Sequence, residues 1–403
     1  MKKMIKLLFV LNMAFMLGVG SVEDAKAQSA NSQTVEQTDP EPEKKLSKRE
    51  QCKADMRPSI PEVRAGFEEW LYREIYPEAL KRDISKETLD DILPTVEFNE
   101  NSYLSDNCKA EWTIDVDDYR DNFLNSYSYK KGKAALRTYE RTLEELYEKH
   151  QVAPHYLMAL FGIESGYGRT TGDYRILDGT ATVAYTTKES SARKKRRKEQ
   201  FVTYFIDTIR LIDRKDMKPE QQGGYLGASG IFQFMPSNIA LYAVDGDHDG
   251  RVDFWENPRD ALASAANFLD VYCKWTPGER VGRRVKLPDN LDKRFYGRNN
   301  GRSVREWAEL GVNLENGDPI PAEDMDAFLV ILEYHYLDDD LKQAYDHLPN
   351  GDEYKAYLGY RNARSIMRWN FSHLFWTTVS DLSDQFREPA APIIHKARKP
   401  TPQ

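Results

Sequence analysis

One carboxylate, Glu164, lies at the end of a predicted helix over residues 154–165. Leu157, Leu160 and Phe161 share its helical face, because residues at i, i+3, i+4 and i+7 line one side of a helix. The apolar neighbours and the negative end of the helix dipole both disfavour ionisation, which predicts a raised pKa for the Glu164 carboxyl group. A carboxylic acid that keeps its proton near neutral pH can donate it to the oxygen of a glycosidic bond. The alternative is an ordinary surface glutamate at a helix end.

A second candidate is Gln233, an amide in the glycine-rich segment over residues 223–237. The density of glycines at the start of this segment allows unusual backbone angles and a close approach, either to a ligand or between two helices. Polar groups in apolar surroundings need hydrogen-bond partners, so Gln233 is predicted to have a specific one.

A metal site is predicted where residues 245–256 fit the calcium-loop pattern D-x-[DN]-x-[DN]-G-x5-E completely. Ca²⁺ prefers six to eight oxygen ligands, and Gly250 at the sixth loop position allows the sharp turn. A single loop of this kind is expected to hold a structural Ca²⁺ of modest affinity. The predicted ligands are Asp245, Asp247, Asp249, the carbonyl of Arg251, Asp253 and Glu256, with Asp260 as a competitor for the last position.

The elements that must position these residues are mostly helical, and the fold class expected is mainly α (α+β). Helical spacing of apolar residues recurs on both sides of the Glu164 segment, whereas Pro, Gly and Asn interrupt short apolar runs after Trp275. The expected parts are an N-terminal helical domain (59–150), a core with the calcium loop (151–275), a small β-containing insertion (276–351), a helical segment that completes the core (352–387) and a flexible tail (388–403).

A basic run covers residues 193–198, at the start of another predicted amphipathic helix. Such charge runs are usually a solvated helix surface. The functional alternative is a basic edge that meets an anionic polymer.

The chain of 403 residues carries 40% hydrophobic and 30% charged residues, which is enough to bury a substantial core. Its net charge of −8 argues against a general nucleic-acid-binding protein. We expect a monomer.

The N-terminus has the pattern of a secretory signal peptide. Lys2, Lys3 and Lys6 precede an apolar run over residues 7–19 that is too short to span a bilayer. An A-x-A-like site at residues 25–27 predicts cleavage after residue 27 and export to the periplasm of the bacterial envelope. The polar stretch that follows, residues 28–58, is expected to be a disordered linker.

Three cysteines, Cys52, Cys108 and Cys273, allow one disulfide in an exported protein. Cys273 lies in an apolar helical run and is expected to be a buried thiol. The predicted pair is therefore Cys52–Cys108.

Several motifs together resemble those of the B-type lytic murein transglycosylases over residues 67–386. The motifs are Glu164-Ser165-x-Tyr167-Gly168-Arg169, Arg175-Ile176-Leu177-Asp178, Arg196-Arg197-x-x-x-Phe201, Gly227-Ala228-x-Gly230-x-x-Gln233-Phe234-Met235-Pro236-Ser237, the calcium loop, and Arg368-Trp369-Asn370-x-Ser372.

The resemblance implies a lysozyme-like helical core, a further helical domain and a small β-containing domain beside the substrate groove. It also implies cleavage of the MurNAc–GlcNAc bond of peptidoglycan with formation of a 1,6-anhydro-muramoyl end, and Glu164 as the single acid and base. The residues expected to contact the substrate are Ser165, Tyr167, Arg196, Arg197, Gln233, Trp369 and Asn370. Of these, Arg196 and Arg197 could contact either the glycan or the acidic peptide stem.

The chain departs from the family at three positions. Gly224 replaces a common serine, Phe268 replaces an aromatic residue with a hydroxyl group, and Trp369 replaces the usual tyrosine. Two other functions remain open: a hydrolytic muramidase of the same fold, and a non-enzymatic, calcium-stabilised protein that binds the cell wall.

Overall fold

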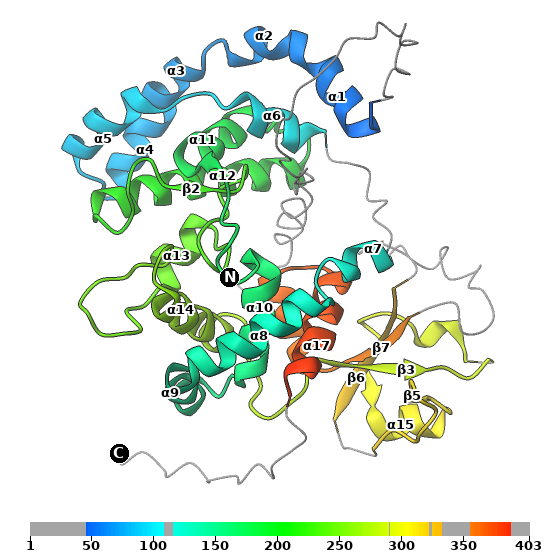
Figure 1. Cartoon of the computed structure of the whole chain (residues 1–403). Coiled ribbons are helices and arrows are strands. Elements are labelled where there is room, and N and C mark those ends of the chain that lie inside the picture. The colour runs from blue at the N-terminus through cyan, green and yellow to red at the C-terminus, as the bar shows by residue number, and fades with distance from the viewer. Residues whose placement is uncertain (1–45, 109–115, 290, 322–324, 333–354, 388–403) are drawn as a thin grey trace, which may run out of the picture.

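The computed structural model describes residues 46–108, 116–289, 291–321, 325–332 and 355–387. Helices make up most of these residues, and a small sheet lies at one side of the molecule (Figure 1). Within the described ranges, no helix has both the length and the apolar composition needed to cross a membrane. The predicted signal peptide, the first part of the predicted linker and the predicted tail lie outside the described residues.

The N-terminal helices lie along one side of the molecule, next to α11 (Ile176–Thr186) and α12 (Ala192–Asp213) (Figure 1). Serine and asparagine caps start several of them, as Ser85 does when its side chain accepts a hydrogen bond from the amide of Thr88. The segments are α1 (Lys48–Met56), η2 (Arg57–Ser59), α2 (Ile60–Arg64), α3 (Phe67–Trp70), η3 (Leu71–Ile75), α4 (Tyr76–Lys81), α5 (Lys86–Ile92), η4 (Leu93–Thr95) and α6 (Glu100–Asn107).

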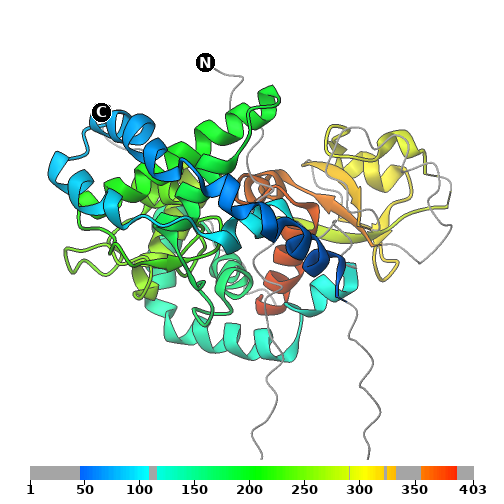
Figure 2. The same cartoon turned by 90° about the horizontal axis from the view of Figure 1, so that it is seen from above.

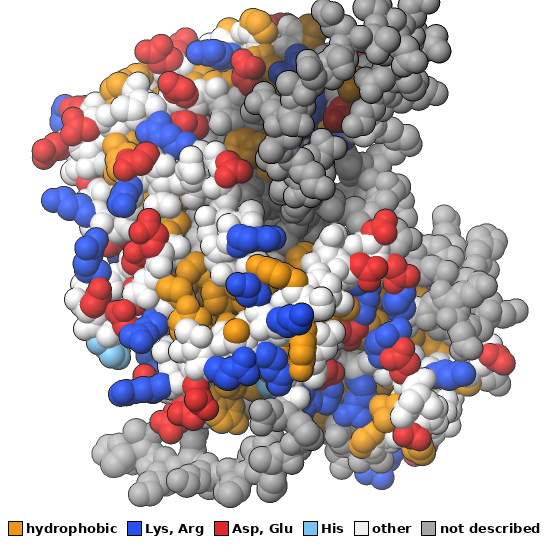
Figure 3. All heavy atoms as spheres, in the orientation of Figure 1, with side chains coloured by type: hydrophobic (Ala, Val, Ile, Leu, Met, Phe, Trp, Pro, Cys, Tyr) orange, Lys and Arg blue, Asp and Glu red, His pale blue; other side chains and the backbone are white. Residues whose placement is uncertain are grey.

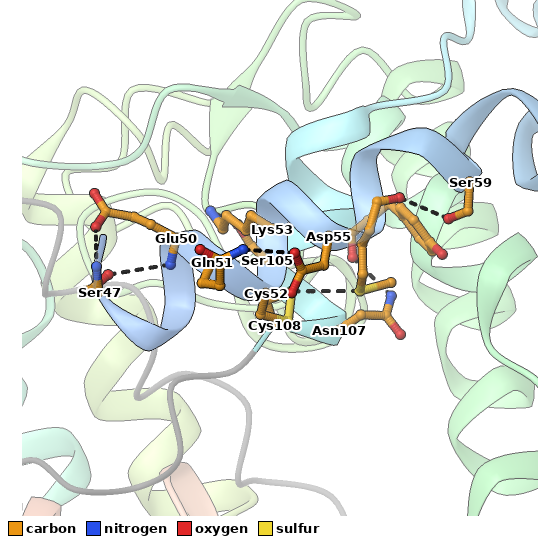
Figure 4. Close-up of a disulfide and its surroundings, with 12 residues drawn as sticks. Ser47, Glu50, Gln51, Cys52, Lys53, Asp55, Ser59, Ser105, Asn107 and Cys108 are labelled. Carbon is orange, nitrogen blue, oxygen red and sulfur yellow. Dashed lines mark hydrogen bonds between the residues drawn. A yellow bond between two sulfur atoms is a disulfide. The ribbon is translucent and has the colours of Figure 1, made fainter. Parts of the chain in front are cut away.

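Helix α1 corrects the predicted linker, which was expected to be disordered up to residue 58. Ser47 and Glu50 form a capping box that starts the helix. The predicted disulfide is confirmed, and it joins Cys52 of α1 to Cys108 after α6 (Figure 4). Polar composition predicted disorder here, but a cap and a covalent link to the helical body together stabilise a helix.

The central helix is α10 (Pro154–Ser165), which packs against α8 (Ser126–Thr138) and α17 (His373–Phe386). The segment before α10 forms two helices instead of one, because Tyr139 leaves the helical conformation between them. The other helices and strands of this part are α7 (Val116–Asp121), α9 (Glu140–His150), β1 (Tyr174–Arg175), β2 (Gln222–Gly223), α13 (Pro236–Tyr242), α14 (Pro258–Val271) and α16 (Arg361–Trp369).

The sheet has five antiparallel strands in the order β4-β6-β7-β3-β5, and Figure 2 shows it beside the helical body. It has a small hydrophobic core of its own, centred on the buried Trp307. The elements are β3 (Gly282–Lys286), η5 (Lys293–Phe295), β4 (Arg302–Ser303), α15 (Val304–Glu309), β5 (Asn313–Leu314), β6 (Asp326–Ile331) and β7 (Ala356–Gly359).

Strand β7 moves the predicted boundary of the β-containing insertion. The insertion was expected to end at residue 351 and to be followed by helix, yet β7 pairs with both β3 and β6. The helical segment therefore begins at Arg361. The four residues of β7 are all buried, and a short apolar run of this kind does not distinguish a strand from a helix in the sequence.

The surface carries charges of both signs, although the chain as a whole is acidic. Figure 3 shows Lys and Arg side chains across the middle of one face, with hydrophobic side chains between them. The net charge of −8 is therefore not spread evenly, and individual surfaces can attract anions.

Candidate functional site

Helix α10 carries Glu164 into the interior of the molecule. Pro154 occupies its first turn, and Gly166 ends it in the left-handed conformation with φ of 57°. All residues from Tyr156 to Ser165 are buried. The sequence suggested one apolar face, whereas the helix is enclosed all round, as expected of a helix whose residues are nearly all apolar.

The Glu164 carboxyl group is buried, with 4% of its residue surface exposed. The indole Nε1 of Trp369 donates a hydrogen bond of 2.7 Å to its Oε1. Burial raises the pKa of Glu164 to about 8, and the hydrogen bond from Trp369 opposes this rise because it stabilises the ionised form. The structure thus contains a carboxyl group that keeps its proton at neutral pH.

Trp369 is fixed by an aromatic cluster. Its ring packs edge-to-face against Phe232, Phe234 and Phe268 at centroid distances of 6.1, 5.2 and 5.4 Å. Phe268 belongs to α14. The two residues that depart from the family pattern, Phe268 and Trp369, therefore pack against each other. This packing holds the indole N–H in place toward Glu164.

The glycine-rich segment forms tight turns close to other backbone and ring atoms. A Cβ on Gly230, whose φ is +71°, would lie 2.4 Å from the ring of Phe254. The predicted partners of Gln233 are main-chain carbonyls, because its Nε2 donates to the oxygens of Gly230 at 2.9 Å and Thr171 at 3.1 Å. Gln233 itself adopts a positive φ of 49°.

Two other residues that were predicted to contact the glycan, Ser165 and Tyr167, form hydrogen bonds with main-chain atoms of the protein. The hydroxyl of Ser165 accepts a hydrogen bond from the amide of Gly168 at 2.9 Å. The hydroxyl of Tyr167 donates to the carbonyl of Ser128 at 2.9 Å, which links the end of α10 to α8.

The two arginines of α12 that were predicted to contact the substrate differ in their surroundings. Arg197 forms an ion pair with Asp106 at 2.7 Å, donates to Thr187 Oγ1 at 2.8 Å and stacks on Phe201. Arg196 is exposed at the surface.

Asn370 follows Trp369 directly and is buried. Its Oδ1 has no hydrogen-bond partner among the described residues. A buried acceptor of this kind is unfavourable unless a ligand or water satisfies it.

Sequence reasoning missed Tyr119, a buried residue of α7. Burial, followed by the charge of Glu164, raises the pKa of its phenol, so the two groups lie within electrostatic range of each other. No local motif marks Tyr119, because the fold brings it to α10 from a separate helix.

The calcium loop brings three of its predicted ligands together. Carboxylate oxygens of Asp245, Asp247 and Asp249 lie within 4.8 Å of one another, whereas Asp253 and Glu256 are not part of this group. Gly250 provides the turn with φ of +89°.

Asp260 is completely buried beside the loop. Its two oxygens accept hydrogen bonds from the amides of Gly246 at 2.8 Å and Asp253 at 2.7 Å. Asp260 therefore holds the loop backbone from both ends, and Arg251 is exposed at the turn.

Comparisons with known proteins give a consistent result. A family model described as the transglycosylase SLT domain matches residues 66–384. Membrane-bound lytic murein transglycosylase B of Escherichia coli (strain K12) is 27% identical over 254 residues. The match covers 61% of this chain and 63% of that protein, so it spans less than two thirds of the relative's length.

Two crystal structures of SltB3 from Pseudomonas aeruginosa are 28% identical to this chain. The complex with NAG-NAM-pentapeptide has a TM-score of 0.69 and covers 81% of this chain and 82% of SltB3. The complex with NAG-anhNAM-pentapeptide has a TM-score of 0.68 and covers 79% of each chain. The Escherichia coli lytic transglycosylase Slt35 in complex with calcium, at 24% identity and a TM-score of 0.61, shares the fold over 80% of this chain and 92% of its own.

The fold is thus the mostly helical, lysozyme-like fold of lytic transglycosylases, with a small sheet beside it. The chain belongs to the transglycosylase SLT domain family.

Proposed function

We propose that this protein is a lytic transglycosylase that cleaves the MurNAc–GlcNAc bond of peptidoglycan and leaves a 1,6-anhydro-muramoyl end. The observation that carries this proposal is the buried Glu164, whose pKa is raised to about 8. Family membership and the peptidoglycan fragments bound by SltB3 support the choice of substrate.

In the first step, neutral Glu164 donates its proton to the oxygen of the scissile bond. The Trp369 N–H is bonded to Oε1, so Oε2 would be the carboxyl oxygen that donates the proton. The bond between C1 of the muramoyl sugar and the glycosidic oxygen breaks, and the proton leaves on that glycosidic oxygen with the departing sugar. The Trp369 hydrogen bond stabilises the carboxylate that remains.

In the second step, the substrate supplies the groups that a second carboxylate would otherwise supply. The acetamido group of the muramoyl sugar stabilises the positive C1 centre, a known exception to the two-carboxylate scheme. Glu164 then takes the proton of the C6 hydroxyl, whose oxygen closes on C1 and restores the neutral acid. The surroundings of Glu164 support a mechanism with one carboxylate. Burial and the hydrogen bond from Trp369 shift the pKa of Glu164, and no carboxylate in the described part of the chain contributes to this shift.

The remaining predicted contacts would orient the glycan. The Asn370 Oδ1, buried and without a partner among the described residues, suits an N–H or O–H donor of the sugar. Gln233, Ser165 and Tyr167 would shape the groove from positions that their main-chain hydrogen bonds hold rigid.

The basic pair on α12 would contribute differently at its two positions. Exposed Arg196 is accessible to an anionic or hydroxylated ligand, whereas Arg197 is held by its ion pair with Asp106 and would support its neighbour.

The acidic loop would bind a structural Ca²⁺ through Asp245, Asp247 and Asp249, with the Arg251 carbonyl, Asp253 and Glu256 completing the ligand set. The convergence of three carboxylates supports this fit, because hard oxygen ligands suit Ca²⁺ and a cation would offset their repulsion. The two amide hydrogen bonds of Asp260 support a role in holding the loop instead of coordinating the ion.

The site of action would be the bacterial periplasm, reached through the N-terminal signal peptide predicted from residues 1–27. The disulfide between Cys52 and Cys108 supports an oxidising compartment.

The test is product analysis on purified peptidoglycan sacculi. The wild-type protein should release fragments with 1,6-anhydro ends, and Glu164→Gln should lose nearly all release while remaining folded. Glu144→Gln, at an exposed position on α9, is the matched control and should behave like wild type. Wild-type-like release by Glu164→Gln would refute the assignment of the acid.

The same measurement separates the alternatives. Reducing-end products, heavier than anhydro products by one water, would identify a hydrolytic muramidase. Binding to sacculi without release of fragments would identify a wall-binding protein.

A further inference from the structure

Helix α7 is anchored on two sides by its two buried residues. Of its six residues, Tyr119 and Arg120 are buried. Neighbouring residues on a helix point about 100° apart, so these two side chains leave α7 in different directions. A helix this short is not stable on its own, and its position therefore depends on what these side chains contact.

Arg120 anchors α7 to α17 and to the sheet. Its Nη2 donates a hydrogen bond to Oδ2 of Asp381 on α17, and the same oxygen accepts a hydrogen bond of 2.7 Å from the Tyr357 hydroxyl of β7. The Arg120 guanidinium also lies 5.7 Å from the centre of the Tyr357 ring. We call Arg120, Asp381 and Tyr357 the α7 clamp.

The clamp is shielded from water. The side chains of Arg120 and Asp381 are 5% and 17% exposed, and removal of one partner from such a pair leaves the other charge buried without compensation. A second ion pair joins Lys355, directly before β7, to Asp117 of α7. Figure 1 shows α7 where the helical body meets the sheet, so both ion pairs fix it at this junction.

Two further charged groups lie in electrostatic range of the clamp. They are Arg284 of β3 and Asp384 of α17. Each has a partner of its own, because Arg284 pairs with Glu315 at 2.8 Å and Asp384 pairs with Arg280 at 2.7 Å. Neither is therefore a ready substitute for a clamp residue.

Tyr119 anchors the other side of α7, near Glu164. Its ring belongs to the hydrophobic core that includes the apolar residues of α10. The pKa of its phenol is raised by burial and then by the charge of Glu164, and it is the one described group with a shifted pKa that reflects this charge. A buried ring in this position excludes water from the surroundings of the acid, which favours the protonated carboxyl group.

We propose that the α7 clamp positions the acid's surroundings: Arg120 and Asp381, together with Tyr357 of the sheet, hold α7 so that Tyr119 shields Glu164 from water. The small sheet thereby acts on the acid through β7. The clamp residues need no contact with substrate, so they are positioning residues. The inference rests on the proposed function only where it concerns catalysis, because its effect on the Glu164 proton can be measured without a substrate.

The test measures how tightly Glu164 holds its proton in clamp variants. For each variant, the free energy of unfolding in urea from pH 4 to 9 is compared with that of the same variant carrying Glu164→Gln. The difference rises with pH and levels off above the pKa of Glu164 in the folded protein. The pH at which it levels off therefore reports this pKa, and in the protein with an intact clamp it should lie near 8.

Arg120→Gln should make the difference level off at least about one pH unit lower, with an about tenfold smaller effect of ionisation on the unfolding equilibrium, because water reaches the acid once α7 is released. Arg120→Lys should shift it less, because it keeps a charge opposite Asp381. Tyr357→Phe removes only a hydroxyl group and should give a smaller shift in the same direction. This milder variant decides the question if Arg120→Gln does not fold.

Arg210→Gln is the matched control. Arg210 of α12 forms an ion pair with the buried Asp207, beside the N-terminal helices, so its removal breaks a partly buried pair that does not involve α7. It should lower stability without changing the pH at which the difference levels off. An unchanged pH in both Arg120→Gln and Tyr357→Phe, or an equal shift in Arg210→Gln, would overturn the clamp.

Fragment release separates this inference from the proposed function. If the protein cleaves peptidoglycan, the alkaline limb of its pH–rate profile should move to lower pH in Arg120→Gln by the same amount as the unfolding difference, and an unmoved limb would overturn the catalytic part of the inference. If the wild-type protein releases no fragments, the proposed function fails, while the unfolding measurements still decide whether the clamp acts on Glu164.

Discussion

The raised pKa of Glu164 has a consequence for stability that needs no substrate. The carboxyl group has a pKa of about 8 in the folded protein because it is buried, against 4.5 as its ordinary value. The folded state therefore binds this proton more tightly than the unfolded state does. Stability from this source is complete below pH 4.5 and decreases as pH rises through 8.

The size of this effect follows from the two pKa values. They differ by about 3.5, and one pKa unit corresponds to about 1.36 kcal/mol. Ionisation of Glu164 inside the fold thus lowers the free energy of unfolding by roughly 5 kcal/mol between acidic and alkaline pH. That is a large fraction of the stability of a typical domain.

Glu164→Gln keeps the shape and the hydrogen-bond acceptor for Trp369 but cannot ionise. Its free energy of unfolding should match wild type near pH 4 and exceed it by several kcal/mol near pH 9. Urea unfolding of both proteins, followed by tryptophan fluorescence from pH 4 to 9, measures the difference. Because other groups titrate in both proteins, the difference curve isolates Glu164.

Glu144→Gln, on the surface of α9, is the control and should give a flat difference curve. A flat curve for Glu164→Gln as well would show that the carboxyl group ionises freely in the fold, and the reasoning from burial to proton donation would fail.

Three further predictions concern the surroundings of the acid and the supports of the fold. Trp369→Phe removes the N–H bonded to Glu164 Oε1, so the alkaline limb of the pH–rate profile should move up by about one unit; an unchanged limb would mean that the hydrogen bond does not act on the acid. Removal of Ca²⁺ with EDTA should lower the melting temperature of wild type but not of Asp245→Asn, because an ion that binds only the folded state stabilises it; equal melting curves with and without EDTA would contradict the proposed site. The Cys52–Cys108 disulfide closes a loop with a separation of 56 residues, so its reduction should destabilise the N-terminal helices by up to about 4 kcal/mol. Urea unfolding with and without reductant measures this loss. No change on reduction would show that α1 is held by packing alone.

Local signals in the sequence predicted the elements that depend on local chemistry. The predicted bounds of α10, residues 154–165, are correct, and Pro154 in its first turn and Gly166 after its end are local signals for them. The disulfide followed from the apolar setting of Cys273, which the structure confirms as a buried thiol. In each case the information lies within a few residues of the feature.

The contacts that define the environment of Glu164 could not be predicted in this way. Trp369 lies 205 residues further along the chain, and nothing in either segment specifies their hydrogen bond. The same applies to the burial of α10 on all sides and to Tyr119. These features arise from the packing of whole elements, so sequence periodicity indicated the apolar character of α10 but not the number of its neighbours.

The departures at Phe268 and Trp369 make physical sense together. The two rings pack at 5.4 Å in an edge-to-face arrangement, so a change at either position alters the surroundings of the other. A hydroxyl group at 268 would need a partner inside an aromatic cluster, and an unsatisfied one would cost about 1–3 kcal/mol. The indole at 369 brings a single N–H, which Glu164 accepts at 2.7 Å. Trp369 therefore provides the single polar contact of the pair, directed at Glu164. The Phe268 ring is wholly apolar and adds to the burial that raises the pKa of Glu164.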